Sequence, residues 1–263
     1  MKKITYINGR HILLLILISI FIIACNKKSD TPAPTTEKGT LMFHLHTNVD
    51  TNEVDNYGTV YITSTGRKIS VNKAQLYISN IQLIKLDGST YNVPDMIVYK
   101  IQETEVYTIG QVPVGNYKSV SFQVGLSPAT NAIATGTGID TVLNHSAMWL
   151  GSTSQPDGYV FLNFKGSIDT TTNPVGSVNK LQAFNYLIAT NANYKKITMP
   201  VQNYTIIPGQ TQFIHMIIDY NKLFTGIQLN DSNNLMVTSA SDNASALGMK
   251  IGNNIPSMFR YEY

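Results

Sequence analysis

The chain has 263 residues, of which 19 are lysine or arginine, 16 are aspartate or glutamate and one is cysteine. Its formal net charge of +3 comes from Lys2, Lys3 and Arg10, which lie in a leader segment, so the rest of the chain carries 16 basic and 16 acidic side chains. This balance excludes the basic footprint of a nucleic-acid-binding domain. A single cysteine excludes a disulfide and a thiolate metal site in the folded domain.

The leader has the pattern of a secretory signal. After the basic start, an almost unbroken apolar run extends from Ile12 to Ile23. Its length as a helix is only about 18 Å, too short for a bilayer core of about 30 Å. A charged start followed by a short apolar region is typical of a signal peptide, which we predict for residues 1–24. A plain transmembrane anchor or a soluble secreted protein is the alternative.

The leader ends in Ile22-Ile23-Ala24-Cys25, which is similar to the lipobox of bacterial lipoproteins. In such proteins the cysteine is diacylated and the chain is cut before it, and two or more acyl chains anchor a protein stably. We therefore predict lipidation at Cys25, followed by a flexible tether, so that residues 25–39 hold the domain off the membrane. The expected location is the cell envelope, at the outer membrane or the cell surface, with a lipid anchor as the membrane contact.

Residues 40–263 are predicted to form one β domain. Apolar and polar residues alternate in many short segments that turn residues separate, which favours strands over helices. Asp87-Gly88 and Pro208-Gly209 are the clearest turn signals. The pattern predicts an all-β, β-sandwich-like single domain with long loops and one or two short helices. The strands are expected at residues 41–46, 71–86 (one bent strand or two), 90–93, 98–101, 105–109, 117–124, 158–164, 196–201, 204–207 and 212–220, and the helices at 221–224 and 244–258.

The common catalytic motifs are absent from the sequence. It contains no GxSxG, no HExxH, no GxxxxGK[ST] and no glycine-rich dinucleotide turn. The lone cysteine is assigned to lipid and is therefore excluded as a nucleophile. We expect a binding protein and not an enzyme.

His44-Leu45-His46 is the arrangement that carries the clearest chemistry. On a strand, residues i and i+2 point to the same face, about 6.5 Å apart. Two imidazoles at this spacing can close on one copper or zinc ion. The alternative is two polar residues on the open face of a strand whose other face carries Phe43 and Leu45.

Other polar residues have simpler interpretations. The stretch Asp50 to Asn56 offers oxygen ligands but lacks the spacing of a calcium loop, so a solvated turn is expected. His145 lies four residues before Trp149, the only tryptophan. His215 alternates with apolar neighbours and is interpreted as a satisfied core or interface side chain.

Several segments together resemble the MbnP-like family of periplasmic or surface proteins, which includes the partner protein of methanobactin and copper-repressible surface proteins. The resemblance extends from about residue 39 to 260 and depends on the order and spacing of the segments, since no single motif is diagnostic. Lipoproteins of this kind are typical of Bacteroidetes-type bacteria. The segments are residues 39–46, 75–83, 115–117, 122–126, 148–149, 158–162, 219–224 and 250–259.

The resemblance implies a β-rich domain and, in copper-binding relatives, a mononuclear site of two histidines and a tryptophan oxidised to kynurenine. Trp149 resembles the family's tryptophan, and His44 and His46 are chosen as the imidazoles by their chemistry. Two departures stand against this site. No second tryptophan follows within residues 150–157, and Leu187 occupies a position where relatives have a histidine. A member with these departures can share the fold without the metal.

The sequence is therefore compatible with two functions. The first is a lipid-anchored protein that scavenges or delivers copper, bound by His44, His46 and Trp149, with a metal-uptake or other envelope protein as partner. The second is a surface interaction module that binds a protein, glycan or peptide and keeps the fold without a metal; exposed tyrosines suit such a surface.

Overall fold

Two β-sheets account for most of the chain that the structure describes. The computed structural model describes residues 36–134, 141–151, 158–172 and 180–262. The predicted signal peptide and Cys25 lie outside these residues. From Glu37 onward the described residues form one compact unit.

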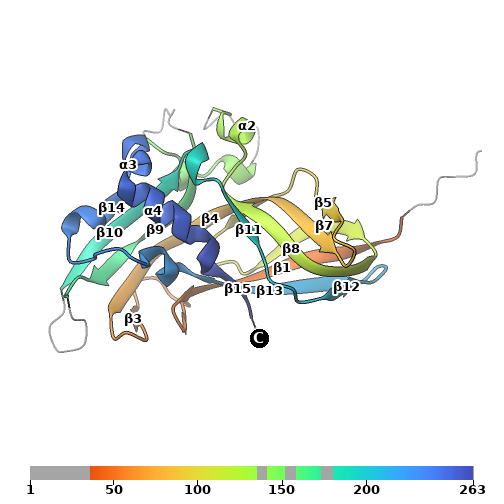
Figure 1. Ribbon diagram of the computed structural model, residues 1–263, viewed down its shortest axis with the longest axis horizontal. Helices are drawn as coiled ribbons and strands as arrows, with labels where there is room; N and C mark the ends of the chain where they lie inside the picture. Colours follow the sequence, from red (N-terminus) through yellow and green to blue (C-terminus); the bar gives the residue numbers. More distant parts are fainter. Residues whose placement is uncertain (1–35, 135–140, 152–157, 173–179, 263) are drawn as a thin grey trace, which may run out of the picture. The chain divides into compact units, whose positions relative to one another are not determined.

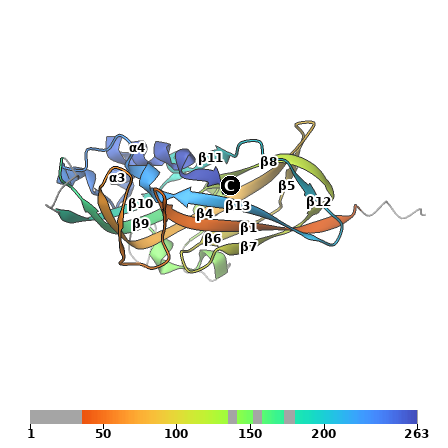
Figure 2. The same cartoon turned by 90° about the horizontal axis from the view of Figure 1, so that it is seen from below.

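The smaller sheet has five strands, and its centre is a parallel pair (Figure 2). β1 pairs with β13 over nine residues, from Thr40 opposite Thr211 to Asn48 opposite Asp219. The other edge of β1 pairs with β7 and then with β2, both antiparallel. β13 in turn pairs with β15 near the C-terminus. The strands are β1 (Lys38–Val49), β2 (Asn52–Glu53), β7 (Val106–Pro113), β13 (Thr211–Asp219) and β15 (Phe259–Tyr261).

The larger sheet has ten strands around the long strand β4 (Figure 1). β4 pairs with β9 and β8 along its length. It also pairs with three short strands, β3, β5 and β6. The strands are β3 (Val60–Ile62), β4 (Lys68–Lys85), β5 (Thr90–Asn92), β6 (Ile97–Lys100), β8 (Gly115–Val124), β9 (Val160–Asp169), β10 (Leu181–Ala189), β11 (Lys195–Thr198), β12 (Tyr204–Ile206) and β14 (Met236–Val237).

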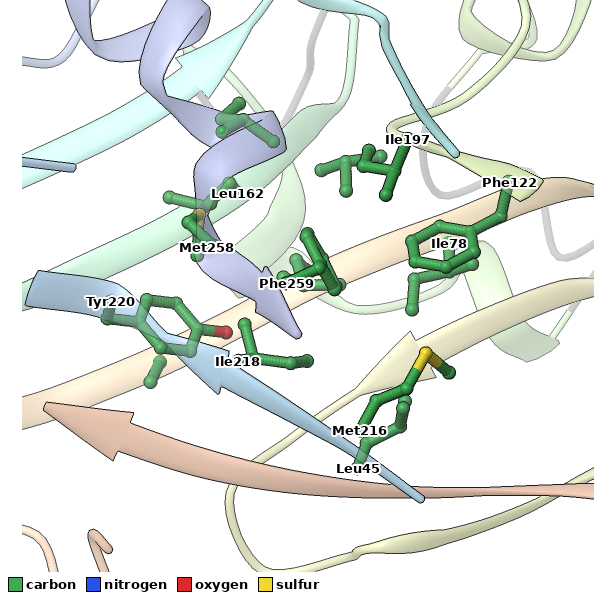
Figure 3. Packing of buried hydrophobic residues seen from close by; sticks show 14 of the residues in the cluster. Leu45, Ile78, Phe122, Leu162, Ile197, Met216, Ile218, Tyr220, Met258 and Phe259 are labelled. Carbon is green, nitrogen blue, oxygen red and sulfur yellow. The ribbon is translucent and has the colours of Figure 1, made fainter. Parts of the chain in front are cut away.

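The main hydrophobic core contains side chains from both sheets. On β1, Leu41, Phe43 and Leu45 are fully buried, and the residues between them point outward, as the period of two requires. Figure 3 shows Leu45 of the smaller sheet beside Met216 of β13, in the same core as Ile78 and Phe122 of the larger sheet. The rings of Phe43 and Phe122 lie 6.3 Å apart between centroids. The sheets therefore pack as a β-sandwich, as predicted.

Helices are short and lie at the connections. The α-helices are α2 (Pro128–Asn131), α3 (Ala240–Ala244) and α4 (Ala246–Asn254), and the 3-10 turns are η1 (Thr141–Leu143), η2 (Ser146–Met148), η3 (Asn191–Asn193), η4 (Tyr220–Phe224), η5 (Ser232–Asn234) and η6 (Ile255–Met258). A capping box between Ser239 and Asp242 starts α3. Within the described ranges, no helix combines the length and apolar character needed to cross a membrane.

Most predicted strands are present, and the differences have identifiable causes. Residues 71–85 lie in one strand and not in two, because β4 is paired along its length and takes up its bend at Asn80. Asn80 has a φ of +50°, which asparagine tolerates better than most residues. Only Val114 separates β7, which ends at Pro113, from β8, which begins at Gly115. The strands that were not predicted are β2, β3, β10, β14 and β15.

Candidate metal centre

Three histidines meet on the outer face of the smaller sheet. His44 and His46 lie on β1 at positions that alternate with the buried Phe43 and Leu45, so both imidazoles leave the sheet on the same side. The parallel pairing places His215 of β13 directly beside His44. The ring centroid of His44 lies 4.3 Å from that of His46 and 4.8 Å from that of His215.

Three glutamates surround these rings, and each comes from a segment that pairs with β1 or β13. Glu53 ends β2 and lies opposite Asn48. Glu105 precedes β7, and its carbonyl accepts the Leu45 N–H at 2.8 Å. Glu262 follows β15, and its N–H donates to the His215 carbonyl at 3.2 Å. Backbone hydrogen bonds therefore hold the segments that carry all three carboxylates.

The nitrogens that face inward converge on a small volume. Nδ1 of His44 lies 2.9 Å from Nδ1 of His215. Oε2 of Glu262 lies 3.3 Å from His215 Nδ1 and 3.2 Å from His46 Nε2. One ligand atom from each of these four residues lies within 4.8 Å of the others. Four ligands at about 2.0–2.1 Å around a tetrahedral metal lie about 3.3 Å from each other, so small side-chain shifts bring this set to coordination distance.

The outward nitrogens of the two β1 histidines face the other two carboxylates. His44 Nε2 lies 3.1 Å from Glu105 Oε2, and His46 Nδ1 lies 2.5 Å from Glu53 Oε1. In this arrangement both nitrogens of each β1 ring have a defined neighbour.

The histidine side chains of the centre become more exposed to solvent from β1 to β13. Side-chain exposure is 13% for His46, 23% for His44 and 46% for His215. His46 Nε2 is buried and lacks a hydrogen-bond partner among the described residues, although Glu262 Oε2 lies 3.2 Å away. A buried ring nitrogen without a partner beside a carboxylate is costly, and a cation between the two atoms removes this cost.

A buried lysine lies on the core side of β1. Lys100 is fully buried, and its ammonium group donates to Thr47 Oγ1 at 3.0 Å and to the Thr104 carbonyl at 3.1 Å. Burial lowers the pKa of Lys100 to about 8, although the nearby carboxylates of Glu105, Glu103 and Glu53 oppose this shift. Positive charge therefore already lies behind the part of the centre that contains Glu105 and Glu53.

Trp149 lies in a different part of the fold. It forms an isolated bridge with Tyr159 before β9, packs against a second hydrophobic cluster, and donates its indole N–H to the Leu143 carbonyl at 3.1 Å. Leu187 packs against the same second cluster. His145 stacks on Tyr99 with ring centroids 4.1 Å apart. The structure thus brings His44 and His46 together but does not add Trp149 to the four converging ligand atoms.

His215 and the three glutamates are the site residues that the sequence prediction missed. The interpretation of His215 as a core side chain was wrong, because its side chain is 46% exposed and faces the other histidines; its interpretation as an interface side chain stays a prediction. Glu53 was included in a predicted solvated turn, and Glu105 and Glu262 carried no signal of their own. The matching apolar alternation of residues 41–45 and 213–218 is the one pattern from which adjacent strands could have been guessed.

Fold and site together define a β-sandwich protein with a histidine and carboxylate cluster on one sheet face. The chain belongs to the MbnP family, since the family model described as MbnP matches residues 38–239. The solved structure "MbnP from Methylosinus trichosporium" has a TM-score of 0.53 at 12% sequence identity, over 85% of this chain and 98% of that chain. At this identity the likeness concerns the fold. No curated protein matches the chain at a significant level.

Proposed function

We propose that this protein is a lipid-anchored, extracytoplasmic protein that binds a divalent transition-metal ion through His44, His46, His215 and Glu262. The observation that carries the proposal is the convergence of three imidazoles and one carboxylate within 4.8 Å from three separate strands or strand ends. Histidines are scarce in this chain, with five in all. Three of them at one point of the surface favour a common ligand over independent polar roles.

The donor set favours a borderline divalent ion. Imidazole suits copper, zinc, nickel and iron, whereas a carboxylate is a harder donor that fits a divalent ion better than Cu(I). Copper(II) binds most tightly in the usual order of divalent affinities, and zinc is close to it in ligand preference. Copper therefore stays the first candidate, now with His215 and Glu262 as the partners of His44 and His46 in place of Trp149.

The proposed role is binding and transfer of the metal, and not catalysis. His215 and Glu262 are 46% and 41% exposed, so one side of the centre is open to solvent and to another protein. An open side permits exchange of the ion with a chelator or a partner. A metal-uptake protein of the envelope is the kind of partner that this role requires.

The anchor and the location rest on the leader sequence. An apolar run of signal-peptide length that ends in Ala24-Cys25 supports lipidation of Cys25 and export to the cell envelope. Cys25→Ala is expected to stop cleavage at this site and to abolish labelling by a fatty-acid probe in cells. Equal labelling of the wild type and the variant would exclude acylation at Cys25.

Equilibrium dialysis of the purified full-length protein tests metal binding. The wild type should retain one Cu²⁺ or Zn²⁺ per chain against a modest chelator, and His44→Ala/His46→Ala should retain none. His145→Ala is the matched control, because it removes an imidazole outside the centre and should bind normally. If the wild type retains no metal, the metal proposal fails and the interaction-module hypothesis takes its place.

A further inference from the structure

The two histidines of β1 make a second set of contacts that metal binding alone does not require. A neutral imidazole has one N–H and one lone pair, and the group that accepts the N–H decides which nitrogen can bind a metal. Glu105 faces Nε2 of His44, and Glu53 faces Nδ1 of His46. Both carboxylates belong to segments other than the strand that carries the histidines.

The two contacts are consistent with one metal position. If His44 Nε2–H donates to Glu105, the lone pair of His44 is on Nδ1, which lies 2.9 Å from His215 Nδ1. If His46 Nδ1–H donates to Glu53, the lone pair of His46 is on Nε2, which lies 3.2 Å from Glu262 Oε2. The free lone pair is on Nδ1 in one ring and on Nε2 in the other. In each case it faces the same four converging ligand atoms.

We infer that Glu53 and Glu105 are positioning residues that fix the tautomers of His46 and His44, so that both lone pairs point to a single metal ion. This inference rests on the proposed metal site and deepens it. Carboxylates that accept the outer N–H of a metal-binding histidine orient the ring and raise its basicity. The carboxylates therefore tune the affinity of the centre without touching the ion.

The competing arrangement is a second metal ion held by His46 Nδ1, Glu53 and Glu105, whose ligand atoms also lie within 4.8 Å of each other. Two features favour the positioning role. Lys100 places a positive charge close enough to interact with Glu53 and Glu105, which opposes a second cation there. A second ion would also require His46 to lose its remaining N–H and to bridge two cations.

Co²⁺ titration of the purified full-length protein, followed by visible absorption, separates the two arrangements. The wild type should bind one Co²⁺ per chain. Glu53→Gln and Glu105→Gln should keep this stoichiometry and the band positions but bind about 10- to 100-fold more weakly. Glu103→Gln is the matched control, because Glu103 is exposed and its substitution removes the same charge two residues from Glu105. The affinity of this variant for Co²⁺ should stay within about threefold of the wild type.

The alternative results are distinct. Unchanged affinity in both glutamine variants would overturn the positioning role, and so would a wild type that binds two ions and a variant that binds one. A wild type that binds no ion would instead refute the metal site itself. Should a variant fail to fold, ¹⁵N NMR of the metal-free wild type reads the tautomers directly. It should show the proton on Nε2 of His44 and on Nδ1 of His46; the reverse assignment would contradict the inference.

Discussion

Metal binding at the centre is expected to raise the melting temperature of the protein by several degrees. The ligands are distant in sequence, with His44 and His215 separated by 171 positions, so the unfolded chain presents at most the His44–His46 pair. An ion that binds the folded state almost exclusively stabilises it by about 2.7 kcal/mol at one hundred times its Kd. For a domain of this size, about 2–4 °C per kcal/mol gives a rise in Tm of about 5–11 °C.

Calorimetry of the full-length protein with Zn²⁺ or with EDTA measures this rise. His44→Ala/His46→Ala should fold, because Phe43 and Leu45 keep the core face of β1 buried, and its Tm should not respond to metal. A single substitution, His215→Ala, should reduce the shift and not abolish it. An equal shift in the wild type and the double variant would place the ion elsewhere and refute the reasoning.

Two further predictions concern the scaffold. Burial of Lys100 lowers its pKa to about 8 from the usual 10.5, so the unfolded state binds more protons between these values and stability should rise with pH, by about 1–2 kcal/mol from pH 8 to 9.5. Lys100→Met should flatten this rise in urea unfolding; an unchanged slope would contradict the assignment. Gly125 has a φ of +109°, and a Cβ there would meet the Phe161 ring at 2.5 Å. Gly125→Ala should therefore lower the free energy of unfolding by about 2–5 kcal/mol, and a loss below 1 kcal/mol would contradict this packing.

The fold was largely predictable because its strands show the period of two. The alternating residues Leu41, Phe43 and Leu45 predict the buried face of β1. The same alternation of apolar and polar residues predicts β13 and β8. β10 was missed because its first three residues, Leu181 to Ala183, are exposed and its apolar residues cluster at the far end. Alternation defines the faces of a strand but not its neighbours, so the parallel pairing of β1 with β13 could not be derived.

The candidate site was predictable only to the extent that it is local. His44 and His46 lie on one strand, and their common face follows from spacing alone. His215 reaches them only through pairing across 171 residues, and Glu262 only through the short strand β15. Trp149 was chosen by family resemblance, and the structure places it with Leu187 in the second hydrophobic cluster, where its indole N–H has a protein acceptor.

Anomalous diffraction from a crystal of the Zn²⁺-loaded protein tests the central claim most directly. Data collected on both sides of the zinc absorption edge locate the ion without reference to the protein geometry. The account predicts one strong peak about 2 Å from His44 Nδ1, His46 Nε2 and His215 Nδ1, with Glu262 as the fourth ligand. A peak beside Trp149, or no peak within reach of these three nitrogens, would contradict it.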